Sequence, residues 1–86
     1  MAGPVSYRVV IARRALESLD AVLNRRLAEE LAQHLSDLAT DPEERGWPLA
    51  GELNGYRCLR SAGGWFRIVY RVAASTVEVV LVSVGQ

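Results

Sequence analysis

Hydrophobic and polar residues alternate most clearly between Trp65 and Val72. Side chains on a β-strand point alternately to the two faces of a sheet, so this stretch predicts a strand with two different faces. One face is apolar and directed to a core: Phe66, Ile68, Tyr70 and Val72. The other face consists of Trp65, Arg67, Val69 and Arg71. Two arginines and a tryptophan on an exposed face suit phosphate contacts and base stacking. A solvated face and a protein-binding surface fit the same pattern.

This strand is the second half of a predicted β-hairpin that spans 51–72. Asn54-Gly55 is a turn signal, a first strand of about six residues starts at Tyr56, and a loose turn falls at 62–64. The two strands carry four arginines: Arg57, Arg60, Arg67 and Arg71. The hairpin therefore predicts a basic surface built into a sheet.

The first half of the chain reads as a strand followed by two helices. Residues 7–11 are rich in β-branched side chains, and a short helical pattern follows from Ala12. A second helix, for which both Asp20 and Asn24 fit as N-cap, ends before Asp41-Pro42. Its apolar residues occupy an arc of roughly 120°. These residues are Leu23, Leu27, Leu31, Leu35 and Leu38. His34 falls within the arc, so we expect it at a boundary between helix and sheet.

The C-terminal stretch 76–84 is continuously apolar, which predicts a central strand buried on both faces or nearly so. In the loop 41–51, Trp47 is expected to cover the edge of the core. The order of elements is strand, helix, helix and three strands. We therefore predict an α+β fold: a small, twisted, mostly antiparallel sheet with both N-terminal helices packed on one face. The face with Trp65, Arg67 and Arg71 is left open.

The composition limits which side chains can act as a base or a nucleophile. With 86 residues the chain predicts a single domain, 1–86, and its formal net charge of zero favours no class of partner. All ten basic residues are arginines, which keep their protons, so His34 is the remaining basic side chain that can act as a general base. The single cysteine, Cys58, is expected to be a small buried hydrophobic residue rather than a nucleophile. It also fits a reducing compartment.

Charge is nevertheless unevenly distributed. Residues 29–44 carry six acidic side chains and no arginine, whereas 56–72 carry four arginines and no acid. We expect a molecular dipole that is basic at the hairpin. The sequence shows no signal peptide, no apolar run of membrane-spanning length and no metal-ligand or cofactor motif, so we expect a cytoplasmic protein with no cofactor and no membrane partner.

Several segments, in their order and spacing, resemble one protein family. These are a leucine-rich helix that ends at a proline, PLAGELNGYR before the hairpin, RIVY in its second strand, and VSVG near the end. Over nearly the whole chain they resemble the RelE-like toxins of bacterial type II toxin–antitoxin systems, within the RelE/ParE superfamily.

The resemblance implies an endoribonuclease that cuts mRNA, usually in the ribosomal A site, and that a cognate antitoxin silences. The reaction is attack of the ribose 2′-hydroxyl on the adjacent phosphate. Arg67 and Arg57 match basic positions of the family and are the expected catalytic residues. Arg60, Arg71 and Trp65 are expected to bind RNA. The antitoxin is expected to cover the open face, using exposed apolar residues such as Trp65 and Val69 and the charges of Arg57 and Arg67.

The chain departs from the family pattern in two ways. It lacks the lysine that the best-known members use as a candidate base, and the sequence ends at Gln86, where the family continues into a catalytic tail. We therefore expect reduced cleavage. Two alternative functions fit the same fold: a ParE-like inhibitor of DNA gyrase, and a disarmed module that binds only its antitoxin.

Overall fold

One mixed sheet organises the chain. The structure is a computed structural model that describes residues 6–20, 25–61, 63–64 and 66–84. In these residues five strands pair in the order β1-β5-β4-β3-β2. Their bounds are β1 Arg8–Ile11, β2 Trp47–Pro48, β3 Arg57–Arg60, β4 Phe66–Ala73 and β5 Thr76–Val84. The β1 strand runs parallel to β5, and the other neighbours are antiparallel. The predicted α+β class and mostly antiparallel sheet are confirmed.

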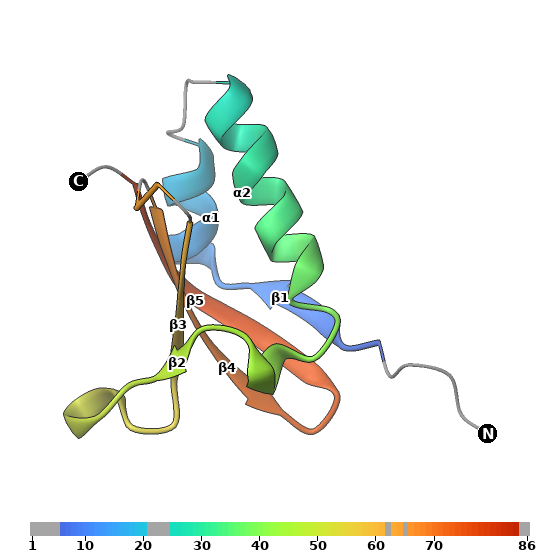
Figure 1. Cartoon of the computed structure of the whole chain (residues 1–86), viewed down its shortest axis with the longest axis vertical. Coiled ribbons are helices and arrows are strands. Elements are labelled where there is room, and N and C mark those ends of the chain that lie inside the picture. The colour runs from blue at the N-terminus through green and yellow to red at the C-terminus, as the bar shows by residue number, and fades with distance from the viewer. Residues whose placement is uncertain (1–5, 21–24, 62, 65, 85–86) are drawn as a thin grey trace.

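Two helices cover one face of this sheet, as Figure 1 shows. They are α1, Arg13–Asp20, and α2, Arg25–Asp37. The core between helices and sheet contains Ala15, Leu31, Leu35, Leu38, Phe66, Ile68, Tyr70, Val77, Val79 and Val82. His34 packs its ring edge-on against Phe66, with 5.3 Å between ring centroids. The predicted apolar arc from Leu27 to Leu38 and the position of His34 are confirmed.

The β5 strand is central, as expected, but it is not buried on both faces. A bulge accommodates Val80: Tyr70 pairs with Val79 while Val69 pairs with Leu81. Because the bulge adds one residue, Val79 and Val82 both face the core although they are three positions apart. Leu81 remains 41% exposed on the opposite face. The expected burial on both faces is wrong because no helix covers that face in the described chain.

The segment after α2 is more regular than the loop that its sequence predicts. Two short 3-10 helices, η1 (Pro42–Glu44) and η2 (Gly51–Leu53), flank strand β2. A turn follows at Asn54-Gly55, as predicted, where Gly55 has φ +96° and the Tyr56 amide donates to the Leu53 carbonyl at 3.0 Å.

The helix boundaries agree only in part with the predicted caps. Asp20 is the last residue of α1, so it does not cap α2. The other candidate, Asn24, and the predicted arc residue Leu23 lie outside the described residues. No helix in the described ranges is long and apolar enough to cross a membrane.

Gly46 allows the segment before β2 to approach β3 closely. A Cβ atom at this position would lie 2.2 Å from the backbone oxygen of Cys58, and Gly46 has φ +61°. Gly51 has a similar φ of +68°, but a Cβ there would meet nothing within 4 Å. A side chain at Gly51 would therefore add backbone strain alone, whereas a side chain at Gly46 would add the same strain and a steric clash with Cys58.

We predict that Gly46→Ala destabilises the fold more than Gly51→Ala. The left-handed conformation alone costs a residue with a side chain about 1–2 kcal/mol, and Gly51→Ala should lose no more than this. Gly46→Ala adds the clash with Cys58, so its free energy of unfolding should fall further. Urea unfolding followed by circular dichroism measures both. Equal losses would show that the close approach at Gly46 is unimportant.

Candidate functional site

The register between β3 and β4 decides which arginines share a face of the sheet. Directly opposite residues of antiparallel strands project to the same side. Arg60 is opposite Arg67, and Arg57 is opposite Tyr70. Since Tyr70 is fully buried under the helices, Arg57 lies on the helix-covered face. Arg60 and Arg67 lie on the other side, which we call the open face.

Arg60 and Arg67 form what we call the arginine pair. Both side chains are exposed, and the described residues offer neither of them an ion pair. The partner of Arg67 on β5 is the uncharged Ser83. Like charges directly opposite each other destabilise a sheet. The arginine pair is therefore a concentration of positive charge that the described part of the fold leaves unneutralised.

An apolar row runs across the sheet beside the arginine pair. It consists of Trp47, Cys58, Val69 and Leu81, one residue from each of four paired strands. The two central members are buried and the two outer ones are exposed: Val69 is 8% and Trp47 is 45% exposed. The expected exposure of Val69 is wrong, because neighbours on both adjacent strands cover it. The expected burial of Cys58 is confirmed.

Trp47 does not cover the core edge as its sequence suggests. Strand β2 pairs with β3 and sets Trp47 opposite Cys58, on the open face. There the Cζ atom of Arg60 lies over the Trp47 ring, 6.0 Å from its centroid. This is the outer limit of a cation–π contact. An aromatic ring and the arginine pair are thus neighbours. Trp65, the expected stacking residue, lies outside the described residues.

Arg71 also reaches the open face, but its charge is already paired. Its Nε atom donates to Oε1 of Glu78, the residue opposite on β5, at 2.7 Å. This hydrogen bond, together with the carboxylate charge, raises the pKa of Arg71. Along β4, the positive charge without a partner therefore lies at Arg67, in the arginine pair, rather than at Arg71.

Arg57 has a different environment from the arginine pair. Its Nε donates to the Arg45 carbonyl at 3.0 Å and its Nη2 to the Gly46 carbonyl at 3.2 Å. The hydroxyl of Tyr70 lies 2.7 and 2.8 Å from the carbonyl oxygens of Pro42 and Arg45, which share its single proton. We call these two side chains and three carbonyls the loop anchor. The structure does not bring Arg57 together with Arg67. It uses Arg57 to hold the segment that leads into β2.

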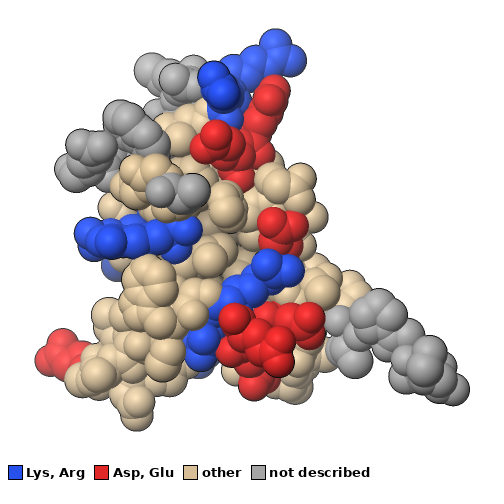
Figure 2. Space-filling view, in the orientation of Figure 1, with Lys and Arg blue, Asp and Glu red and all other residues tan. Residues whose placement is uncertain are grey.

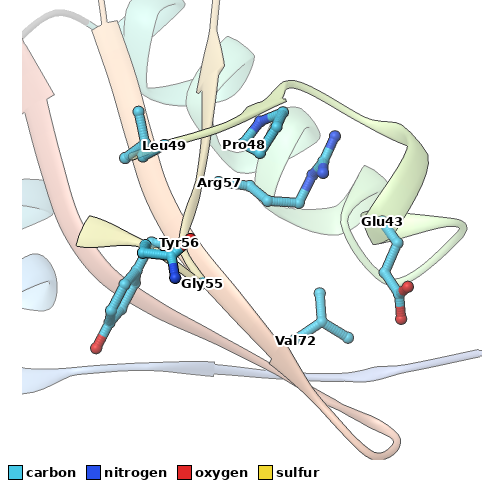
Figure 3. A pocket seen from close by; sticks show the side chains of 8 residues that line it. Glu43, Pro48, Leu49, Gly55, Tyr56, Arg57 and Val72 are labelled. Carbon is cyan, nitrogen blue, oxygen red and sulfur yellow. The ribbon is translucent and has the colours of Figure 1, made fainter. Parts of the chain in front are cut away.

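A hollow of about 390 Å³ lies next to the loop anchor. Its lining consists of Glu43, Pro48, Leu49, Asn54, Gly55, Tyr56, Arg57 and Val72. In Figure 3, Arg57 and Glu43 lie on one side of β4, and the Tyr56 ring points away from them. Figure 2 shows acidic side chains gathered over η1, directly beside basic ones. Opposite charges are therefore neighbours beside the hollow. The hollow is separate from the arginine pair, because neither Arg60 nor Arg67 lines it.

Known structures share the fold of this chain. No family model and no curated protein matches the sequence. A chain of the RelBE2 toxin–antitoxin complex from Mycobacterium tuberculosis superposes with a TM-score of 0.83 at 28% identity, over 93% of this chain and 92% of that one. The isolated E. coli RelE toxin gives 0.78 at 20% identity, over 94% and 86%. A chain of the ParDE system of P. aeruginosa gives 0.72 at 15%, over 94% and 98%.

The fold, the two helices on one face and the open sheet face define a small α+β domain of the RelE/ParE type. Within this type the chain is similar to RelE-like toxins, since its likeness to a chain of the RelBE2 complex extends over 93% of this chain and 92% of that one. The RelE-like resemblance expected from the sequence motifs is confirmed.

Two features of the site were missed at the sequence level. The odd spacing between Arg57 and Arg60 already sets them on opposite faces of a regular strand, so this signal was present in the sequence. The position of Trp47 had no such signal, because a two-residue strand is too short for a recognisable alternation.

We predict that Tyr70→Phe destabilises the fold in a pH-dependent way. Burial raises the pKa of the Tyr70 phenol above 10, an effect that Arg57 partly offsets. At pH 8 the variant should lose about 1–2 kcal/mol of unfolding free energy, because the Pro42 carbonyl loses its donor. Above pH 10 the unfolded wild type releases the phenol proton while the folded form retains it, so the wild-type advantage declines.

Urea unfolding at pH 8, 9, 10 and 11 tests this prediction. Tyr56→Phe is the matched control, because it removes a phenol outside the loop anchor and should show no such trend relative to the wild type. A difference between wild type and Tyr70→Phe that stays constant up to pH 11 would contradict the raised pKa of the buried phenol.

Proposed function

We propose that this chain is the toxin of a type II toxin–antitoxin pair and that it cleaves mRNA on the ribosome. The observation that carries the proposal is the arginine pair: two exposed, permanently charged side chains facing each other on the open face of a RelE-like fold. Guanidinium groups bind phosphate through paired N–H donors and remain protonated at any working pH. Such a pair is suited to an RNA backbone.

In the proposed reaction the ribose 2′-hydroxyl gives its proton to water and attacks the adjacent phosphate, which forms a 2′,3′-cyclic phosphate while the 5′-oxygen leaves and takes a proton from water. Negative charge builds up on the non-bridging phosphate oxygens in the transition state. Arg67 lies on β4, between β3 and β5, and this rigid position suits a group that must stabilise that charge without reorganising. Arg60 assists from β3. Arg57 takes part as a positioning residue, because its N–H groups are engaged in the loop anchor.

An antitoxin is the proposed regulator. RelBE2 and the RelBE proteins of E. coli are toxin–antitoxin complexes. The open face of this chain offers such a partner an unneutralised arginine pair beside the exposed ends of an apolar row, Trp47 and Leu81. A segment that presents acidic and apolar side chains would cover both. Covering the arginine pair would block the RNA site directly.

Binding without cleavage is a second candidate, favoured by one observation. On the open face the arginines keep their protons, Cys58 is buried, and the carboxylate of Glu78, which could accept a proton, is paired with Arg71. His34 lies on the helix-covered face against Phe66. An antitoxin-binding module or a ParE-like gyrase inhibitor requires no proton acceptor. A gyrase supercoiling assay and a partner pull-down test these functions.

We predict that Arg67→Gln lowers RNA cleavage without lowering the stability of the fold. Cleavage should fall by about 100-fold or more, the usual effect of removing one donor to a developing charge. The free energy of unfolding should stay constant or rise by about 0.2–1 kcal/mol, because the repulsion with Arg60 is relieved. Cleavage is measured on mRNA in a reconstituted translation reaction, and stability by urea unfolding.

Arg26→Gln is the matched control, because Arg26 is exposed on α2 and the substitution changes net charge equally. It should leave cleavage unchanged. Undiminished cleavage by Arg67→Gln would remove Arg67 from the mechanism. If the wild-type chain cuts no mRNA in this reaction, the ribonuclease function is refuted and gyrase inhibition becomes the first alternative.

A further inference from the structure

We propose that Trp47 is a nucleobase-stacking residue of the RNA site, working beside the arginine pair. This inference rests on the proposed function and extends it to a specific contact. Sequence alternation assigned stacking to Trp65 alone. The structure instead brings Trp47, from a distant part of the chain, onto the open face next to Arg60.

Trp47 has the exposure that stacking requires. The large hydrophobic side chains that the described residues expose are Val10, Leu16, Trp47, Leu53 and Leu81. Trp47 is the aromatic member of this set, and it is the one in contact with the arginine pair. A base that stacks on Trp47 gains the contact area of an indole ring. Any base can make this contact, because every base has a π-face. The Arg60 guanidinium over the ring adds a cation to the same stack.

The spacing of the strands relates the ring to the phosphate-binding side chains. Trp47 lies on β2, Arg60 on β3 and Arg67 on β4. Neighbouring strands are about 4.8 Å apart, and Arg67 lies two residues along β4 from Val69, which is level with Trp47, so about 12 Å separates the backbone positions of Trp47 and Arg67. One nucleotide with its flanking phosphate spans such a distance. The geometry therefore fits a base on Trp47 and the adjoining phosphate at the arginine pair.

The loop anchor holds Trp47 in place before RNA binds. The carbonyls of Arg45 and Gly46, the two residues before Trp47, accept hydrogen bonds from Arg57. On the other side, Trp47 and Pro48 pair with β3. A residue fixed on both sides loses little backbone entropy when it binds a ligand. This role explains why Arg57 contributes to an RNA site although it lies on the opposite face.

The test measures how the intact chain binds a non-cleavable RNA. The probe is a 2′-O-methyl hexamer of uridine at low salt, and its abasic counterpart has the same backbone without bases. Variants are made in a Trp65→Phe background, so that Trp47 is the remaining tryptophan and its fluorescence reports stacking directly. The variants are Trp47→Leu and Trp47→Phe, with Leu53→Ala as an exposed hydrophobic control away from the arginine pair.

We expect Trp47→Leu to weaken binding of the uridine hexamer by about 5- to 100-fold, the range for loss of one base stack. Trp47→Phe should retain most of the affinity, and Leu53→Ala all of it. The abasic probe should bind wild type and Trp47→Leu equally. RNA should quench the fluorescence of Trp47. A merely structural role would not produce rescue by phenylalanine together with insensitivity to the abasic probe.

Two results would overturn the inference and leave the proposed function intact. One is unchanged hexamer affinity in Trp47→Leu while Arg67→Gln still weakens it. The other is an equal loss of affinity for both probes, which would assign Trp47 to backbone or protein contacts. Failure of the wild-type chain to bind the hexamer, together with failure to cut mRNA, would remove the proposed function as well.

Discussion

The pairing register of β3 with β4 is the constraint on which the site depends. It sets Arg60 opposite Arg67 on the open face and Arg57 opposite Tyr70 under the helices. A slip of one residue would exchange the two faces, burying the arginine pair and exposing the core side chains of the hairpin. Because Phe66, Ile68 and Tyr70 contribute to the core, the hydrophobic effect fixes this register. The same apolar packing that stabilises the fold therefore positions the charges.

The loop anchor links this register to the edge of the sheet. Arg57 and Tyr70 both donate to the Arg45 carbonyl, so residues from two neighbouring strands hold one loop residue. This contact fixes the segment before Trp47 and brings an aromatic side chain to the open face. A buried polar group of this kind destabilises the fold when its hydrogen-bond partner is missing. When every group in the network has a partner, the network makes the segment rigid. In the described chain, no buried side-chain polar atom lacks a hydrogen-bond partner.

Much of the fold follows from residues that can be read in the sequence. The alternation of 66–72, the leucine arc of α2 and the turn at Asn54-Gly55 each have a local physical cause, and each is found in the structure. The site was harder to predict because it depends on pairing between distant segments. Nothing local shows that Trp47 pairs with Cys58, that Glu78 neutralises Arg71, or that Val69 is covered from both adjacent strands. The position of Arg57 was predictable, because residues three positions apart on a strand lie on opposite faces and Arg57 is three positions from Arg60.

The central claim is that RNA binds the open face and that Arg57 acts from behind it. NMR of the isotopically labelled chain, with the guanidinium Nε–H signals of the arginines followed as the 2′-O-methyl uridine hexamer is added, tests this claim most directly. We predict large shifts for Arg60, Arg67 and the Trp47 indole, with much smaller shifts for Arg57 and for the residues of α2. Large shifts at Arg57 and along η1, with none at Arg60 and Arg67, would move the site to the hollow beside the loop anchor and contradict the claim.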